Sequence, residues 1–337
     1  MAKWFPGRRL SWVRLSVVGV VVAGLVAGGI YGVNRYEDQV TASERKPWFD
    51  AYVDVTSTPS LAFESPGDDG QRNVVLAFVV ASPDESCTPT WGGFYNLDEA
   101  GETLDLDRRL ARFRMQGGAA MVSFGGQANS DLSLVCTDAD ALQKGYQDVI
   151  DRYELASIDM DIEGEPPADP PAIKRQAAAI AATQKARPES DGLDVWLTLP
   201  VGPSGLTFEG AEAVRAYIAA DVQLAGINAM TMNYNTGTDT DLTDTIIDSL
   251  NSTQAQLRAL YQEVDVNIGE ATAWSRISAT PMIGQNDVRE DVFTVEDAQA
   301  LAKFSTDKGM SRLSMWSLNR DQACGANWPD LRRVSDS

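Results

Sequence analysis

The sequence predicts an α/β fold, a TIM (β/α)8 barrel preceded by one N-terminal transmembrane helix. Eight apolar runs of β type alternate with amphipathic helical patterns after residue 47, as expected of a parallel sheet covered on both faces. An uncharged run, residues 15–33, precedes them. The sequence contains neither GxGxxG nor the phosphate loop GxxxxGK followed by Ser or Thr. A barrel is therefore favoured over a doubly wound nucleotide-binding sheet.

Residues 15–33 are expected to cross a membrane. The segment consists mostly of Val, Gly, Ala and Leu, and at about 1.5 Å per residue it spans most of a hydrocarbon layer about 30 Å thick. Basic residues precede it in the stretch 1–14, so the positive-inside rule places this tail in the cytoplasm and the rest of the chain outside the cell membrane. A cleaved signal peptide is the alternative, and the protein would then be secreted.

The predicted membrane segment also carries a glycine pattern. Gly24, Gly28 and Gly32 recur at four-residue spacing on one helix face, which lets two membrane helices approach closely and predicts a weak homodimer. Residues 34–46 are expected to form a polar juxtamembrane linker, and residues 47–337 the barrel domain.

The strands and helices of the barrel are expected to alternate along the chain. The strands are predicted at the eight apolar runs 51–55, 74–80, 119–124, 157–162, 195–199, 227–232, 276–281 and 313–316. The helices are predicted at the amphipathic patterns 105–115, 139–153, 172–185, 211–219, 253–263 and 295–307. In such a barrel, chemistry collects where the strands end and the following loops begin.

The composition excludes several classes of function. The formal net charge is −20, and such an acidic chain repels phosphate backbones, so nucleic acid is not expected as a partner. The sequence contains no histidine, which excludes a Ser-His-Asp triad, a Cys-His pair and a His-ligated metal site. We expect no metal and no cofactor, and catalysis by carboxylates, hydroxyls, amides or lysine.

The three cysteines show no CxxC spacing, so a zinc or redox motif is not expected. Outside the cytoplasm, thiols are expected to be oxidised. Because Cys87 and Cys136 follow neighbouring predicted strands, we expect them to form a disulfide and Cys324 to remain free.

Three carboxylates lie at the end of the fourth predicted strand. Asp159, Asp161 and Glu163 alternate with Met160 and Ile162, so the acidic side chains share one strand face, the interior face in a barrel. Like-charge repulsion and desolvation raise the pKa of at least one such carboxyl group, as a general acid requires. A solvated acidic strand end and a divalent metal site are the alternatives.

Together with four other segments, these carboxylates resemble the glycoside hydrolase family 18 chitinases of secreted bacterial type. The resemblance runs from about Trp48 to Cys324. The family fingerprint DxxDxDxE is matched at residues 159, 161 and 163. Residues 123–126 (Ser-Phe-Gly-Gly) resemble its SxGG motif, and residues 230–234 (Met-Thr-Met-Asn-Tyr) resemble its MTMDY motif. Residues 280–287 and 314–321 resemble its segments at strands seven and eight.

The resemblance implies retaining, substrate-assisted hydrolysis of β-1,4-linked N-acetylglucosamine polymers. Glu163 would act as the general acid and base, and Asp161 would orient the N-acetyl group that serves as the nucleophile. Asp159 would hold the proton balance of the cluster. Tyr234 and the neighbouring Asn233 would contact the acetamide.

The resemblance also implies a set of substrate-binding residues. Trp316 would form the floor under the distorted sugar, with a cis peptide bond after it. Trp91 would either stack on a sugar or pack within its own loop. The remaining residues expected to shape the pocket are Ser123, Gly125, Gly126, Met230 and Met232.

Two departures from the family pattern leave alternatives open. Ala156 stands where the fingerprint has its first Asp, and Asn233 stands where MTMDY has its Asp. Both changes remove a carboxylate, so a surface-anchored glycan-binding barrel with little turnover is one alternative. An endo-β-N-acetylglucosaminidase acting on glycans is the other.

Overall fold

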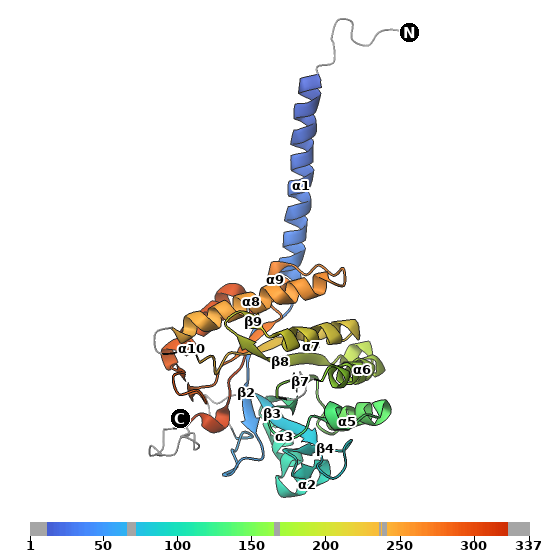
Figure 1. The fold of residues 1–337 in the computed structure, drawn as a ribbon, viewed down its shortest axis with the longest axis vertical. Helices are drawn as coiled ribbons and strands as arrows, with labels where there is room; N and C mark the ends of the chain where they lie inside the picture. Colours follow the sequence, from blue (N-terminus) through green and yellow to red (C-terminus); the bar gives the residue numbers. More distant parts are fainter. Residues whose placement is uncertain (1–11, 66–71, 165–168, 236, 238–240, 323–337) are drawn as a thin grey trace, which may run out of the picture.

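The computed structural model describes residues 12–65, 72–164, 169–235, 237 and 241–322. Within this part of the chain, the eight predicted strands all form and run parallel around a barrel (Figure 1). They are β2 (Ala51–Asp54), β3 (Asn73–Ala81), β6 (Ala119–Gly125), β7 (Ser157–Asp161), β8 (Asp194–Gly202), β10 (Leu224–Met230), β11 (Ile277–Thr280) and β14 (Arg312–Leu313). The predicted barrel is thereby confirmed.

The last strand closes the barrel. β14 pairs in parallel with β1 (Trp48–Phe49), which leads directly into β2. On its other side, the Ser314 N–H donates to the Ala279 carbonyl of β11 at 2.9 Å. β14 therefore lies between β11 and the β1–β2 segment, and no edge is left open at this seam.

Helices connect the strands and cover the barrel. They are α3 (Leu106–Met115), α5 (Ala139–Arg152), α6 (Pro170–Ala186), α7 (Phe208–Ala219), α8 (Leu242–Gln262) and α10 (Val295–Lys308). The largest difference from the prediction is in α8, which begins eleven residues before the predicted start at 253. Its start is determined by Asp241, whose side chain accepts a hydrogen bond from the Asp244 N–H as an N-cap.

Short elements complete the described part of the chain. They are β4 (Pro89–Trp91), β5 (Tyr95–Asn96), α2 (Leu97–Thr103), α4 (Leu132–Val135), η2 (Glu189–Asp191), β9 (Gly205–Leu206), α9 (Glu270–Trp274), β12 (Gly284–Gln285), β13 (Val292–Phe293) and η3 (Leu318–Arg320).

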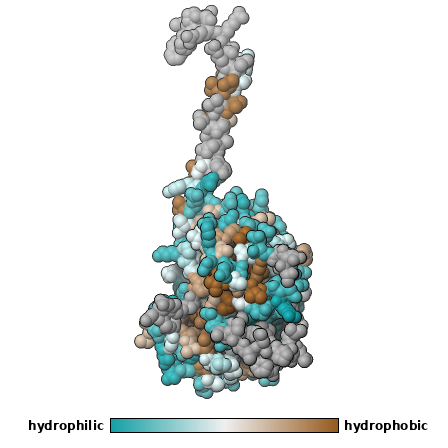
Figure 2. All heavy atoms as spheres, turned by 90° about the vertical axis from the view of Figure 1, so that its left-hand side faces the viewer, coloured by the Kyte–Doolittle hydropathy of each residue, from teal (hydrophilic) through white to brown (hydrophobic). Residues whose placement is uncertain are grey.

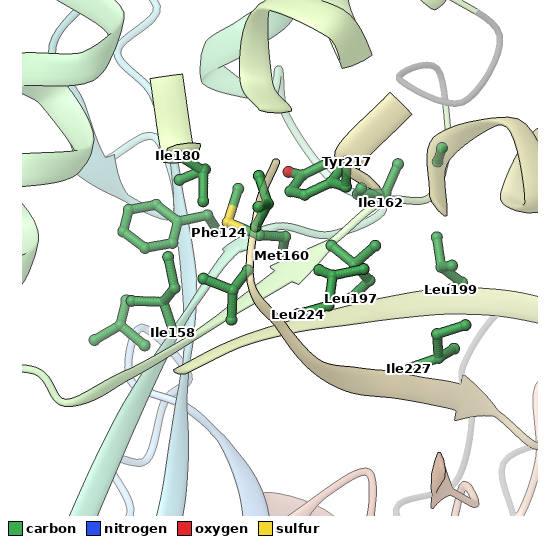
Figure 3. Close-up of a cluster of buried hydrophobic side chains, with 14 of the residues drawn as sticks. Phe124, Ile158, Met160, Ile162, Ile180, Leu197, Leu199, Tyr217, Leu224 and Ile227 are labelled. Atoms are coloured by element: carbon green, nitrogen blue, oxygen red, sulfur yellow. The ribbon is translucent and has the colours of Figure 1, made fainter. Parts of the chain in front are cut away.

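The main apolar core lies between the barrel and its helices. Ile158 and Met160 of β7 and Ile162 after it are fully buried and project toward the helix layer, beside Ile180 of α6 and Tyr217 of α7 (Figure 3). Because side chains alternate along a strand, Asp159 and Asp161 must face the barrel interior. The packing of the apolar face thus determines the direction of the acidic face.

The N-terminal region forms one long helix, α1 (Trp12–Ser43), which extends away from the barrel (Figure 1). Within the residues that the structure describes, no helix combines the length and apolar character needed to cross a bilayer. The transmembrane helix predicted at 15–33 is therefore not supported. The weak homodimer predicted from Gly24, Gly28 and Gly32 is not supported either, because it requires a membrane-spanning helix.

The segment predicted as a linker, residues 34–46, is mostly helical because α1 continues to Ser43. Its Asp38 accepts hydrogen bonds at 2.9 Å from the backbone N–H groups of Ala271 and Thr272. These groups open α9, whose own N-cap, Gly269, offers no side chain. Asp38 thus caps the N-terminus of α9, although the two lie far apart in the sequence. Since α9 precedes β11, α1 docks at the end of the barrel where strands begin.

The predicted disulfide is confirmed. Cys87 and Cys136 are joined with a Cα–Cα distance of 4.8 Å, and Cys324 lies outside the described residues. The barrel face seen in Figure 2 is largely hydrophilic, with apolar patches between the polar side chains, in keeping with the acidic composition.

Candidate active site

A cavity of about 300 Å³ opens at the carboxyl ends of the barrel strands, opposite the end where α1 docks. It brings together segments that are far apart in the sequence. Its lining residues are Tyr52, Asp54, Phe78, Gln127, Ala128, Asp161, Glu163, Thr198, Met230, Met232, Asn233, Thr280, Met282, Asp287 and Trp316. Of the residues predicted from the sequence, Asp161, Glu163, Asn233, Met230, Met232 and Trp316 are placed here.

Asp159 lies inside the barrel at the foot of this cavity and is fully buried. Its Oδ2 accepts hydrogen bonds from the Tyr52 hydroxyl and from Ser123 Oγ, both at 2.8 Å. Its Oδ1 accepts one from Thr198 Oγ1 at 2.6 Å. Three hydroxyl donors thus converge on this one carboxyl group.

Asn228 determines the direction of these hydrogen bonds. Its side-chain Nδ2 donates to the Tyr52 hydroxyl at 3.1 Å and to Thr198 Oγ1 at 3.0 Å, so both hydroxyl oxygens already act as acceptors. Its Oδ1 accepts from Thr280 Oγ1 at 2.8 Å. The hydroxyl protons of Tyr52 and Thr198 are therefore free to point at Asp159.

Asp161 is in the opposite situation. It is 3 % exposed, and its Oδ1 has no hydrogen-bond partner among the described residues. Burial raises the pKa of Asp161 well above its usual value, and the negative charges of Glu163 and Asp159 raise it further. Asp161 is thus a carboxyl group that holds a proton more tightly than usual, has one oxygen without a hydrogen-bond partner among the described residues, and lines the cavity.

Glu163 follows β7 and is partly exposed in the cavity. Burial raises the pKa of Glu163 to about 6, a backbone hydrogen bond from Gln127 opposes this shift, and the charge of Asp287 adds to it. A carboxyl group with this pKa can donate a proton in mildly acidic solution, which is the property of a general acid.

Asn233 and Asp287 form a paired unit at the cavity wall. Asn233 has a positive φ of 57°, and its Oδ1 accepts from the Asp287 N–H at 3.0 Å. Its Nδ2 donates to Asp287 Oδ2 at 3.4 Å. Position 233 therefore lacks the carboxylate of the family pattern, but Asp287 supplies a carboxylate to the cavity beside it.

Trp316 provides an aromatic wall, as predicted. It stacks on Phe78 with a centroid distance of 5.5 Å and an interplanar angle of 23°, and it tilts against Tyr52 at 5.7 Å. The peptide bond between Trp316 and Ser317 is cis, which confirms the prediction, and the bond between Ala77 and Phe78 is also cis.

Three residues predicted as substrate contacts, Ser123, Gly125 and Gly126, do not line this cavity. Ser123 is fully buried and donates to Asp159, so it supports the carboxylate and does not line the cavity. Gly125 and Gly126 have positive φ angles of 101° and 86°. A Cβ on Gly125 would lie 2.3 Å from the Asp161 carbonyl oxygen, so this glycine allows β6 to approach β7 closely.

Two aromatic residues are also placed away from the cavity. Trp91 is fully buried, and its Nε1 donates to the Tyr153 hydroxyl at 2.9 Å, so it packs within its loop and cannot stack on a sugar. Tyr234 packs against the core because the positive φ angles of Asn233 and Asn235 turn the chain on either side of it. Burial raises the pKa of Tyr234.

Several lining residues were not predicted from the sequence. Tyr52, Phe78 and Gln127 are supplied by strands and loops without a polar motif. Asp287 belongs to a segment that resembles the family, and that resemblance could have indicated it. For the described residues, no group of three or more His, Cys, Asp or Glu side chains is arranged to hold a metal ion.

Comparisons with known proteins find similarity to chitinases, although no family model matches the chain. The chain is 31% identical over 294 residues to "Probable bifunctional chitinase/lysozyme" of Escherichia coli (strain K12), covering 84% of this chain and 32% of that protein. It is 30% identical over 255 residues to "Endochitinase 11" of Metarhizium anisopliae, covering 74% of this chain and 48% of that protein. The chain thus spans about a third and about half of the length of these two relatives.

Solved structures show the same fold. The catalytic domain of a hyperthermophilic chitinase from Pyrococcus furiosus superposes with a TM-score of 0.71 at 27% identity, covering 82% of this chain and 85% of that one. A GH18 chitinase from Pseudoalteromonas aurantia gives a TM-score of 0.56 at 14% identity, covering 81% and 95%, and shows likeness of fold alone.

Proposed function

We propose, on the premise that this chain has the fold of the glycoside hydrolase family 18 chitinases, that it hydrolyses β-1,4-linked N-acetylglucosamine polymers with retention of configuration. The named chitinase relatives and the GH18 structural neighbours support a glycoside hydrolase. The observation that carries the proposal is the contrast among the three interior carboxyl groups. Asp159 is surrounded by donors, Asp161 is unsatisfied, and Glu163 is poised to donate a proton.

In the proposed reaction, Glu163 protonates the glycosidic oxygen while the substrate's own acetamide oxygen attacks the anomeric carbon. The leaving sugar departs as an alcohol, and an oxazolinium ion forms on the remaining sugar. Asp161 passes its proton toward the Glu163 carboxylate and stands as an anion beside the positive ring. This proton returns to Asp161 before the second step, so that Glu163 is a carboxylate again. Glu163 takes a proton from water as the water oxygen attacks the anomeric carbon, the bond from this carbon to the acetamide oxygen breaks, and the acetamide is restored.

The cavity walls position the substrate for these steps. Trp316, backed by Phe78, offers an aromatic face for the C–H groups of the reacting sugar. The amide of Asn233 faces the cavity with Asp287, and it can form a hydrogen bond to the substrate but cannot carry a proton or charge.

Incubation with oligomers of N-acetylglucosamine, followed by mass spectrometry, separates the enzyme from a binding protein. Appearance of shorter oligomers supports the proposal. Binding of the oligomers without cleavage would favour the glycan-binding alternative.

The dependence of activity on pH is expected to follow Glu163. The acid must be protonated to act, and its pKa is raised to about 6. The protonated form is therefore present below about pH 6 and is lost as the pH rises through this value. We expect kcat/KM to fall above about pH 6 in a pH–rate profile.

A variant of Asp287 tests the cause of this fall in kcat/KM above about pH 6, which is the basic limb of the pH–rate profile. Its charge raises the pKa of Glu163, so Asp287→Asn is expected to move the limb to lower pH. The exposed Asp248→Asn on α8 is the matched control and should leave the limb in place. A limb that does not respond to Asp287→Asn would show that Glu163 is not the group being titrated.

We further propose that the barrel functions outside the reducing environment of the cytosol. The disulfide between Cys87 and Cys136 supports this placement, because such bonds persist in oxidising compartments.

A further inference from the structure

The tip of the β4–β5 hairpin presents an exposed aromatic ring that the proposed reaction does not use. Trp91 of β4 pairs with Tyr95 of β5, and residues 92–94 form the loop between them. Phe94 in this loop is 72 % exposed. Single apolar residues are common on protein surfaces, so a role for Phe94 depends on where its ring lies relative to the cavity.

The hairpin tip lies at the rim of the cavity. The Gly92 N–H donates at 2.9 Å to the carbonyl of Phe78, which lines the cavity. The Gly92 carbonyl accepts from Asn129 Nδ2 at 3.0 Å, and Asn129 directly follows the lining residues 127 and 128. β4 pairs with the last residues of β3, beyond those that pair with β2, and β6 occupies the other side of β3. The tip therefore lies over the carboxyl end of β2.

The ring of Phe94 lies beside a residue that contacts a cavity carboxylate. A Cβ added to Gly92 would lie 3.2 Å from Phe94 Cδ2 and 3.1 Å from Thr56 Cγ2, so the ring and the threonine are on the same side of this glycine. Thr56 Oγ1 in turn donates to Asp54 Oδ1 at 2.7 Å, and Asp54 lines the cavity. The aromatic surface is thus continuous with the cavity wall at Asp54.

Asp54 is fixed in place and can still accept a hydrogen bond. Its Oδ1 also accepts from the Thr56 N–H at 2.8 Å, and its Oδ2 accepts from Ser57 Oγ at 2.7 Å. Asn319 bonds both backbone groups of Asp54, the N–H at 2.9 Å and the carbonyl at 3.1 Å. A carboxylate offers about four acceptor sites, so after these three side-chain hydrogen bonds it can accept one more from a hydroxyl group in the cavity.

The hairpin that carries Phe94 is anchored at both ends. Before the tip, Trp91 is fully buried and donates to the Tyr153 hydroxyl, and the disulfide between Cys87 and Cys136 ties the start of the hairpin to the end of α4. After the tip, Asn96 caps the N-terminus of α2. A ring held on an anchored loop loses little conformational freedom when it binds a ligand.

We propose that Phe94, beside Asp54, forms an outer subsite that binds a sugar ring of the polymer away from the bond that is cleaved. This inference rests on the proposed function. The aromatic face of Phe94 packs on the apolar C–H face of the sugar, and Asp54 accepts a hydrogen bond from a hydroxyl group at the cavity rim. Only oligomers that extend beyond the cavity reach Phe94, so the subsite gives a preference for long chains.

The test compares a long and a short substrate in the full chain. In Phe94→Ala, the ratio of kcat/KM for the N-acetylglucosamine hexamer to that for the 4-nitrophenyl glycoside of the dimer should fall about 3- to 10-fold, as expected for loss of one aromatic contact. The loss should be in KM, because the contact is the same before and during the reaction. Phe94→Trp keeps an aromatic face and should keep the ratio. An unchanged ratio in Phe94→Ala would overturn the inference.

A second exposed phenylalanine provides the matched control. Phe208, the first residue of α7, is 75 % exposed and is not among the residues that line the cavity. Phe208→Ala makes the same chemical change and should leave the ratio of the two substrates in place. An equal fall in this control would assign the effect to loss of any exposed aromatic ring and would also overturn the inference.

A measurement without turnover separates this inference from the proposed function. Isothermal titration calorimetry of the hexamer on Glu163→Gln and on Glu163→Gln/Phe94→Ala compares binding in proteins that lack the proton donor. The second variant should bind the hexamer about 3- to 10-fold more weakly. An inactive wild type would refute the proposed function, whereas equal Kd values of the two variants, or no binding by either, would refute the outer subsite.

Discussion

Glu163→Gln is expected to lower kcat on N-acetylglucosamine oligomers by about 10²–10⁴-fold, because glutamine cannot protonate the glycosidic oxygen. Glutamine matches the size of glutamate, and Glu163 is only partly buried, so folding and KM should change little. The measurement is the steady-state rate of oligomer cleavage by chromatography. Glu209→Gln, an exposed position in the first turn of α7, serves as the control and should retain full activity.

A substrate with a more acidic leaving group tests specifically whether Glu163 donates a proton. A 4-nitrophenyl glycoside has an acidic leaving group that needs little protonation, so Glu163→Gln should lose much less of its rate on this substrate. Equal losses on both substrates would mean that Glu163 has a role other than proton donation.

Asp161→Asn is expected to lower kcat by about 10²–10³-fold on both kinds of substrate. Asparagine retains the shape of the side chain and can still orient the acetamide. It cannot become an anion beside the oxazolinium ion, and that ion forms whichever group departs. The matched control is Asp248→Asn, which makes the same chemical change at an exposed position on α8.

The two variants therefore differ in their dependence on the leaving group. A loss in Asp161→Asn that is limited to oligomers, as expected for Glu163→Gln, would contradict the role proposed for Asp161. The comparison of the two substrates in both variants distinguishes a proton donor from a stabilising anion.

Much of the barrel could be predicted because its strands are apolar on the face that meets the helices. Ile158, Met160 and Ile162 alternate with the acidic residues, and this period of two determined both the strand and the direction of its polar face. The start of α8 was missed because the buried face of its first turns is partly polar, with Thr245 and Ser249 beside Ile246 and Leu250. The N-terminal segment was predicted from hydropathy alone, and the docking of Asp38 on α9 depends on tertiary contact.

The candidate site could be predicted only where a motif carried it. Asp159, Asp161 and Glu163 followed from their spacing, whereas the hydrogen-bond donors to Asp159 come from three other strands, β2, β6 and β8. Arg312 of β14, which is fully buried in an ion pair with Asp50, could not be found in the sequence either, because an arginine gives no sign of burial there. Its place depends on Asp50, which lies 262 positions away along the chain.

The predictions for Trp91 and Tyr234 show the limit of reasoning from residue type. An aromatic side chain suits both a sugar-binding surface and a packed loop. Trp91 is fully buried and donates a hydrogen bond to Tyr153. Tyr234 packs against the core between two asparagines with positive φ angles. Neither local conformation is apparent in the sequence.

The central claim is that the anomeric carbon undergoes two successive displacements, as the substrate-assisted reaction requires, and not one direct attack of water. The most direct test is ¹H NMR of the newly formed reducing end during the first minutes of oligomer hydrolysis, before the anomers interconvert. Two successive displacements at the same carbon predict that the β anomer appears first. Initial release of the α anomer would show inversion by direct attack of water and would contradict the account.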